Sequence, residues 1–247
     1  MHNTEEKNYI FGIRAIIEAV EAGKTIDKLF IQKGLHNDLF AELWKLVREK
    51  RINYKHVPLE KINRLTRKNH QGVFAFISPI DFHNIEDVIP KLYEEGKNPL
   101  VLVLDRITDV RNFGAIARTA ECAGVDTILI PEQNAAAINA DAIKTSAGAL
   151  HKVTVCRTWN LKLALQFMKE SGIQLIGCTE KTQENMYKPN YTTPTAIIIG
   201  SEEDGVSPEF LKMCDARAKI PMNGKIASLN VSVATGVILY EAIRQRG

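Results

Sequence analysis

Two short apolar runs, Leu100–Leu104 and residues 196–199, set the strongest limit on what this chain can fold into. A strand without polar alternation is typical of a sheet that is covered on both faces. From Pro99 onward such segments alternate with helix-like ones. This alternation predicts a parallel sheet flanked by helices. The further strands are expected at 127–130, 153–156 and 173–177, and the helices at 113–123, 141–150, 161–171 and 233–246.

The first third of the chain has shorter elements. We expect helices at 9–22, 35–50 and 59–66 and strands at 28–32, 54–57 and 72–77. These predict a small α/β domain over residues 1–78. Residues 79–98 contain two prolines and are expected to form a linker with a short helix at 85–95. Residues 99–247 form the second expected domain.

Basic residues are concentrated in the first domain. Residues 1–80 contain 14 Lys+Arg against 9 Asp+Glu, and the remainder contains 18 against 20. Within residues 48–68 there are 8 basic and 2 acidic side chains. This density suits a phosphate backbone as partner. A solvated basic helix face is the alternative.

The composition is that of a globular protein, with 45% hydrophobic and 25% charged residues. No apolar run approaches the roughly 20 residues that span a bilayer, so no membrane partner is expected. The polar start, residues 1–7, is unlike a signal or transit peptide. We therefore expect a cytoplasmic protein with reduced thiols. The scattered cysteines and histidines have no metal-ligand spacing, so no metal is expected.

Three loops are expected where ligands bind in such sheets, beyond the carboxyl ends of the strands. In the first, Asn112 is a suitable N-cap, and Arg118 follows on the helix. Arg118 is either a functional cation or a surface ion-pair partner of Glu121 or Glu202.

The second loop places three adjacent acids, Glu202, Glu203 and Asp204, between Gly200 and Gly205. Their mutual repulsion indicates either a functional need or a solvated acidic turn. The segment is not a phosphate loop, because it lacks the Lys and Ser/Thr of that motif.

The third loop covers residues 220–232 and leads into the last helix. Ser228 and Asn230 are N-cap types, because their side chains accept hydrogen bonds from a first helical turn. The helix is expected to have one apolar stripe, formed by Val233, Val237, Tyr240 and Ile243. An ordinary capped helix and a polar-ligand loop both fit this segment.

Taken in series, the three loops resemble the motifs of the SpoU/TrmH (SPOUT) family of RNA ribose 2′-O-methyltransferases. The matching residues are Asn112-x-Gly114-x-x-x-Arg118-Thr119-Ala120, Gly200-Ser201-Glu202-x-x-Gly205, and Ile220-Pro221-Met222 with Ser228-Leu229-Asn230-Val231-Ser232. The N-terminal domain is similar to the family's ribosomal-protein-like RNA-binding domain, through Gly12 and His70-Gln71-Gly72. One departure is Glu203, where many family members have Gly.

The resemblance implies a homodimer with a C-terminal trefoil knot that transfers methyl groups from S-adenosylmethionine. Its substrate would be a ribose in 23S rRNA, that of a guanosine. The implied catalytic residues are Arg118, Asn112, Glu202, Ser228 and Asn230. The implied cofactor-binding residues are Thr179, Gly200, Ile220, Met222 and Leu229. The basic candidates for RNA contact are Arg14, Arg64, Arg67, Lys68 and His70.

Three other functions are weighed against this one. A tRNA ribose is the alternative substrate, because the catalytic motifs are shared. A non-catalytic RNA-binding protein would be expected to lack Arg118, Glu202 or Asn230, and all three are present. A nucleotide-dependent oxidoreductase would need a Gly-x-Gly-x-x-Gly after a strand, and none follows any predicted strand.

Overall fold

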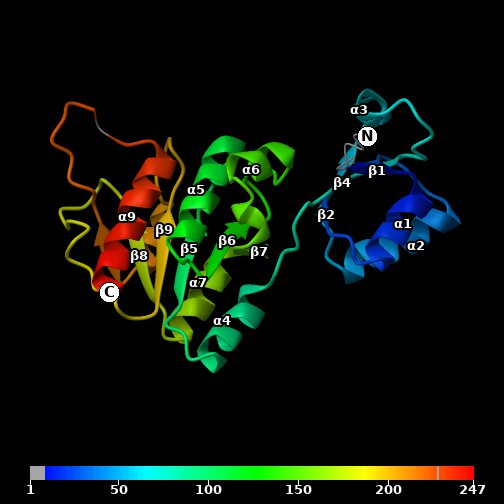
Figure 1. The fold of residues 1–247 in the computed structure, drawn as a ribbon. Helices are drawn as coiled ribbons and strands as arrows, with labels where there is room; N and C mark the ends of the chain where they lie inside the picture. Colours follow the sequence, from blue (N-terminus) through cyan, green and yellow to red (C-terminus); the bar gives the residue numbers. More distant parts are fainter. Residues whose placement is uncertain (1–8, 227) are drawn as a thin grey trace, which may run out of the picture. The chain divides into compact units, whose positions relative to one another are not determined.

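The computed structural model describes residues 9–226 and 228–247. The chain divides into two compact units (Figure 1). The first contains the residues up to Asp81 and also Ile138–Ala140, and the second contains Phe82–Ala137 and Asp141–Gly247. Both units combine helices with one sheet, which confirms the expected α/β class. The exact domain limits and the trefoil knot stay predictions.

The first unit has a mixed sheet with the strand order β1-β4-β2-β3. β4 runs antiparallel to β1 and β2, and β3 runs parallel to β2. Its elements are β1 (Tyr9–Phe11), α1 (Ile13–Glu21), β2 (Ile26–Gln32), α2 (Asp38–Glu49), β3 (Tyr54–Val57), α3 (Leu59–Leu65) and β4 (Val73–Ile77).

The prediction of a helix from residue 9 is wrong at its start. Residues Tyr9–Phe11 form β1, with Tyr9 opposite Phe76 of β4. Gly12 has a φ of 90°, a left-handed conformation that ends the strand and turns the chain into α1. A stretch of three residues is too short for a period of two to stand out beside the helical pattern that follows it.

The second unit is built on six parallel strands in the order β10-β8-β9-β5-β6-β7. Its helices are α4 (Ile85–Glu94), α5 (Val110–Cys122), α6 (Ala140–Thr145), α7 (Leu161–Glu170), α8 (Pro208–Met213) and α9 (Val231–Arg246). Its strands are β5 (Leu100–Leu104), β6 (Thr127–Pro131), β7 (Thr154–Thr158), β8 (Gln174–Cys178), β9 (Thr195–Ile199) and β10 (Ala216–Ala218). The three-residue β10 was not expected from the sequence.

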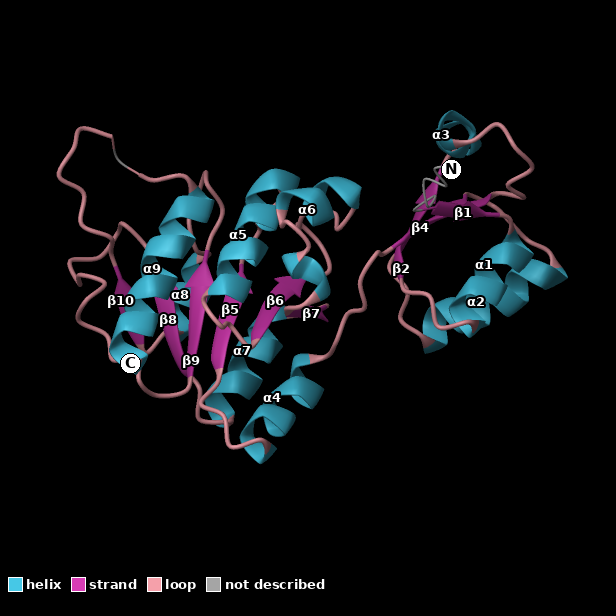
Figure 2. Ribbon diagram, viewed as in Figure 1, coloured by secondary structure: helices cyan, strands magenta, loops and turns pink. Residues whose placement is uncertain are grey.

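Two layers of helices cover this sheet (Figure 2). α5 packs against α9, while α7 packs against α4 and α8. Val101 and Val103 of β5 belong to the core cluster beneath α4 and α7, together with Ile89 and Leu165. The helix expected within the linker therefore packs into the core of the second unit.

The apolar stripe expected on α9 is not the side that the helix buries. The helix buries Val231, Ile238, Leu239 and Ala242, whereas the expected residues Val233 and Tyr240 are 52% and 55% exposed. Periodicity finds helical spacing of apolar residues, but α9 has them on more than one side, so the pattern does not identify the covered face.

The turn after β9 leaves no room for a side chain at Gly200. A Cβ atom placed there would lie 1.9 Å from the carbonyl carbon of Gly205 and 2.0 Å from the amide nitrogen of Val206. The close approach accompanies a bridge between Ser201 and Gly205, in which the Gly205 amide donates to the Ser201 carbonyl over 2.9 Å. The turn thus carries Glu202, Glu203 and Asp204 at its tip.

We expect Gly200→Ala to lower the free energy of unfolding by about 3 kcal/mol or more, because backbone must move to admit the methyl group. Gly224→Ala is the matched control, since no atom lies within 4 Å of a Cβ at that position. Its change should stay within about 1 kcal/mol. Urea unfolding followed by circular dichroism measures both, and similar midpoints for the two variants would contradict the tight turn.

Candidate active site

Three neighbouring strand ends bring the expected loops together. β5 pairs with β9 and β9 pairs with β8, all in parallel, so their carboxyl ends lie at one edge of the sheet. The first loop follows β5, the second follows β9, and Thr179 follows β8. The chain order of strands reverses around β5, which is where ligands bind in sheets of this kind.

Asn112, Glu202 and Asn230, one from each loop, form a hydrogen-bonded cluster. The Asn112 Nδ2 donates to Glu202 Oε1 over 2.7 Å. The Asn230 Nδ2 donates to Asn112 Oδ1 and to Glu202 Oε1, each over 3.1 Å. We call this set the Asn–Glu–Asn cluster. The carboxylate of Glu202 thus accepts hydrogen bonds from two side-chain amides and is not simply solvated.

The helix caps differ from expectation in one case and agree in another. The N-cap of α5 is Asp109, whose Oδ1 accepts from the Asn112 amide over 2.7 Å, so the capping role predicted for Asn112 is wrong. This leaves the Asn112 side chain to the cluster. Asn230 does cap α9, with its Oδ1 accepting from the Ser232 amide over 3.0 Å.

A buried carboxylate fixes the second loop against the first. Asp105, only 2% exposed, accepts through Oδ2 from the Ser207 amide over 2.7 Å and from the Ser207 hydroxyl over 2.6 Å. Arg106 donates to Asp105 Oδ1, to Asp204 Oδ2 and to the Gly205 carbonyl. Sequence reasoning missed both residues, although an acid directly after a buried strand is a detectable signal.

A hollow of about 270 Å³ lies at the ends of β8 and β9. We call it the β8–β9 pocket. Its walls include all five residues expected to bind the cofactor, Thr179, Gly200, Ile220, Met222 and Leu229, and also Glu202 and Ser228. Its volume is near the lower end of the range of small-molecule sites, about 300–1,000 Å³.

The walls of this pocket combine apolar side chains with backbone and a few polar groups. Ile199, Val231 and Ile238 provide apolar surface, and Glu180 and Ser201 provide polar atoms. Burial raises the pKa of the Cys178 thiol, which also lines the pocket, so this group stays neutral.

A second hollow of about 300 Å³, the β5–β9 pocket, adjoins the first. It is lined by Asp109, Asn112 and Asn134 among others, and it shares Ser201, Glu202, Glu203 and Val231 with the β8–β9 pocket. Glu202 therefore stands where the two hollows meet, and its hydrogen-bond partner Asn112 lines the β5–β9 pocket.

Arg118 lies apart from this arrangement. It is exposed on α5 and lines neither pocket. The ion pairs considered for it do not form: Glu121 pairs with Lys152 over 3.8 Å, and Glu202 belongs to the cluster. Within the described parts of the chain, Arg118 has no hydrogen bond or ion pair, so its guanidinium is available to a ligand or to another chain.

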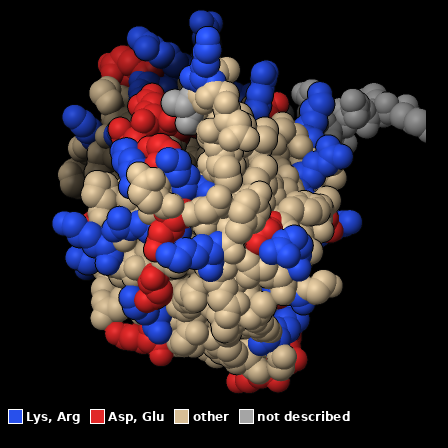
Figure 3. All heavy atoms as spheres, turned by 90° about the vertical axis from the view of Figure 1, so that its left-hand side faces the viewer, with Lys and Arg blue, Asp and Glu red and all other residues tan. Residues whose placement is uncertain are grey.

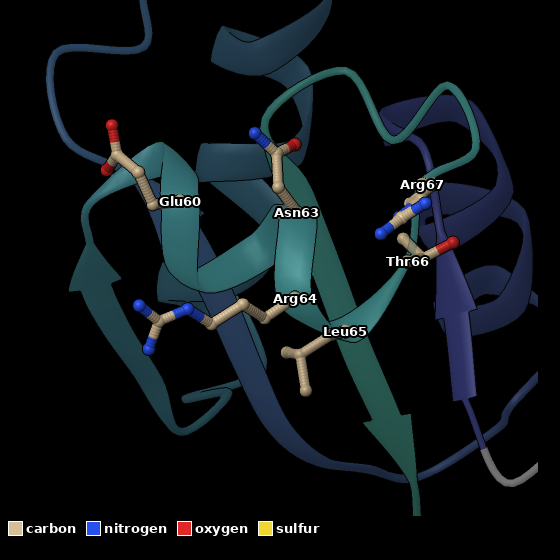
Figure 4. A pocket seen from close by; sticks show the side chains of 6 residues that line it. All are labelled: Glu60, Asn63, Arg64, Leu65, Thr66 and Arg67. Atoms are coloured by element: carbon tan, nitrogen blue, oxygen red, sulfur yellow. The ribbon is translucent and has the colours of Figure 1, made fainter.

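The basic candidates of the first unit have different surroundings. Arg64 and Arg67 border a hollow of about 730 Å³ at the end of α3 (Figure 4). Lys68 is exposed. Arg14 is exposed and forms an ion pair with Glu42 over 3.4 Å. These four side chains can be reached by a phosphate group.

His70 is nearly buried, and its expected contact with RNA stays a prediction. The side chain is 8% exposed, and its Nδ1 accepts from the Gly72 amide over 3.0 Å. The protonated Nε2 therefore donates to Asn63 Oδ1, 2.8 Å away. The neighbouring Gln71 accepts from the Ile13 amide at the start of α1 over 3.0 Å. Both side chains hold the backbone in place.

Among the described residues, no group of three or more His, Cys, Asp or Glu side chains is arranged to hold a metal ion. None of the helices they form is long and apolar enough to cross a membrane.

Comparisons with known proteins identify the family of this chain. The model of the SpoU rRNA Methylase family matches residues 99–240. The model of the RNA 2′-O ribose methyltransferase substrate-binding domain matches residues 9–83. A relative in Bacillus subtilis, described as a TrmH family tRNA/rRNA methyltransferase, is 31% identical over 98% of both chains. One in Staphylococcus saprophyticus with the same description is 34% identical, over 98% of this chain and 97% of its own.

Solved structures show the same fold. The SpoU methyltransferase AviRb of Streptomyces viridochromogenes, solved with its cofactor AdoMet, has a TM-score of 0.62 and 24% identity, over 96% of this chain and 90% of its own. The A. aeolicus TrmH/SpoU tRNA modifying enzyme has a TM-score of 0.55 and 36% identity, over 66% of this chain and 84% of its own. Because both family models match and the two relatives are more than 30% identical over nearly the whole chain, the chain belongs to the SpoU/TrmH family of RNA methyltransferases.

Proposed function

We propose that this enzyme transfers the methyl group of S-adenosylmethionine to a ribose 2′-hydroxyl of a guanosine in 23S rRNA. The observation that carries the proposal is the Asn–Glu–Asn cluster, whose Glu202 lines the β8–β9 pocket. The name of the matching family model, an rRNA methylase, supports the rRNA substrate. A tRNA ribose is the second candidate, favoured by the 36% identity to the A. aeolicus tRNA modifying enzyme.

The residues of the β8–β9 pocket fit the proposed cofactor. Gly200 contributes backbone to the wall, and the apolar side chains of Ile220, Met222 and Leu229 suit an adenine ring and a methionine chain. When bound, S-adenosylmethionine supplies an electrophilic methyl group on a sulfonium centre. Glu202 and Ser228 line the same pocket and would supply polar atoms beside the bound cofactor.

The β5–β9 pocket is the proposed place of the target nucleotide. There, Asn112 can donate hydrogen bonds to a ribose and accept them from it, and Glu202 can accept them. These contacts would orient the ribose hydroxyl toward the adjoining pocket. The hydroxyl is a weak nucleophile and must lose its proton as the bond to carbon forms. A guanidinium stays protonated, so Arg118 stabilises the developing oxyanion and does not act as a base.

Because Arg118 lines neither pocket of its own chain, we place it in the site of a second copy. Such a homodimer would use the outward side of α9, where Val233 and Tyr240 are more than half exposed. On the β10 and α9 side of the molecule, a broad area without charged side chains is visible (Figure 3). Apolar surface of this kind is typical of an interface between copies. The expected cytoplasmic location stays a prediction.

Arg118→Ala should abolish methylation, with a loss of at least about a hundredfold, because the charge that stabilises the oxyanion is removed. Affinity for S-adenosylmethionine should stay within a few-fold, since Arg118 does not line the β8–β9 pocket. Transfer of a labelled methyl group to unmodified rRNA and calorimetric cofactor binding measure the two effects. The control is Lys162→Ala, an exposed cation on α7. Near wild-type turnover of the Arg118 variant would refute its role.

Glu202→Ala should lower turnover by about a hundredfold, because Asn112 and Asn230 lose the carboxylate that orients them. Steady-state turnover and KM for rRNA, measured at saturating cofactor, report the effect. Glu209→Ala, which removes an exposed acid from α8, is the control. An equal loss of turnover in both variants would mean that any loss of negative charge lowers the activity, and would contradict a specific role of the cluster.

Mixing the inactive Arg118→Ala and Glu202→Ala proteins should restore measurable methylation, because each mixed dimer then contains one site with both residues. The doubly substituted Val233→Glu/Tyr240→Glu protein should be a monomer in sedimentation velocity and inactive. Leu163→Glu, at a position that is 49% exposed on α7, is the matched control and should remain dimeric. Activity that does not return on mixing would place Arg118 in the site of its own chain.

A further inference from the structure

The sheet of the first unit has two different faces. Its alternate residues Leu29, Ile31, Val73 and Ala75 join the core beneath α1 and α2. The residues between them point to the opposite side. There, Tyr9 and Phe11 of β1 lie opposite Phe76 and Phe74 of β4, and Phe74 lies opposite Phe30 of β2. We call these five rings the aromatic sheet face.

The rings of this face are in contact with one another. Tyr9 is stacked on Phe74, with centroids 5.2 Å apart and an interplanar angle of 19°. Phe76 meets Phe74 edge to face at 5.2 Å and Phe30 at 6.2 Å. Phe30 and Phe74 are buried, while Tyr9, Phe11 and Phe76 are half-buried and remain within reach of solvent.

Only part of the face is covered within the described chain. Ile62 of α3 packs on Phe30 and Phe74, in one cluster with Val57. A sheet with helices on one side normally presents polar residues on the other. Tyr9, Phe11 and Phe76 break this rule, and an apolar surface of this kind calls for a partner.

The charges beside the rings identify the chemistry of the partner. Lys28 and Lys61 place their Nζ atoms 5.8 Å and 5.2 Å from the centroid of the Phe30 ring. Lys55 of β3 lies opposite Phe30 and is exposed. β1, β3 and β4 contain no carboxylate, and β2 contains one, Asp27, near its start. α3 adds Arg64 and one acid, Glu60.

We infer that the aromatic sheet face binds unpaired nucleotides of the RNA substrate by base stacking. Aromatic rings stack on any base, and lysines at their border attract the phosphates that link these bases. A face of this size can take about two or three bases. This inference rests on the proposed RNA substrate, and it adds contacts to Arg64 and Arg67, which border the hollow at the end of α3.

The test uses the full chain and an unstructured RNA oligonucleotide of about 12 nucleotides, alone and annealed to its complement. Tyr9→Leu/Phe11→Leu keeps apolar side chains in the sheet but removes two rings. Its affinity for the single strand should fall about tenfold for each ring. Its affinity for the duplex, in which the bases are already stacked, should not change. The slope of affinity against salt should also stay, because the lysines remain.

Tyr54→Leu is the matched control. Tyr54 is 43% exposed in the same sheet, but it lies opposite Leu29 and contacts Trp44, on the side of α2. This variant should bind the single strand like the wild type. Ultraviolet cross-linking of the wild-type chain to the oligonucleotide provides a second measurement that needs no substitution. The cross-linked peptides should contain residues 9–11 or 74–76.

Three outcomes overturn the inference. They are equal single-strand affinity of the double variant and the wild type, an equal loss in Tyr54→Leu, and cross-links confined to other segments. If circular dichroism shows that the double variant is unfolded, the cross-links decide. Methyl transfer by the wild type to rRNA is measured in parallel. If no methyl transfer to rRNA is detected while the binding and cross-linking results are as expected, the proposed function is refuted and the inference on the aromatic sheet face is retained.

Discussion

The proposed site depends on one buried carboxylate. Asp105, at the end of the central strand β5, accepts two hydrogen bonds from Ser207 and one from Arg106. A buried carboxylate without such donors would be costly, so the first and second loops are held together. Arg106 extends the connection to Asp204 and Gly205. The tight turn at Gly200 then carries Glu202 to a fixed place at the rim of the β8–β9 pocket.

The start of α9 is tied to the same place through two different atoms of Asn230. Its Oδ1 accepts from the first turn of the helix, and its Nδ2 donates to the cluster. A cap that used both atoms for the helix would leave none for the cluster, whereas a serine hydroxyl would offer a single atom for both tasks. Capping and site formation are therefore compatible in an asparagine, and the two explanations of this residue do not compete.

The sequence predicts much of this architecture because its strongest signals are local. The uninterrupted runs of β5 and β9 are confirmed as strands, since a continuous apolar run is a signal carried by near neighbours. The expected strand 54–57 is confirmed as well. What fails depends on distant contacts. The covered face of α9 is chosen by α5, and β1 exists because β4 pairs with it. The proposed place of Arg118 in the site of a second copy would, likewise, depend on packing between chains, which local sequence does not specify.

The two units differ in what their motif residues do. In the second unit, the side chains of Asn112 and Asn230 are hydrogen-bonded to Glu202, which lines the β8–β9 pocket. In the first, His70 and Gln71 hold the turn before β4 and the start of α1, with their polar atoms occupied inside the protein. The motif residues of the first unit stabilise its backbone. The proposed contacts to RNA therefore involve other residues. Aromatic and lysine side chains on an open sheet face meet that need, because stacking tolerates many base sequences and requires no fixed pattern of residues.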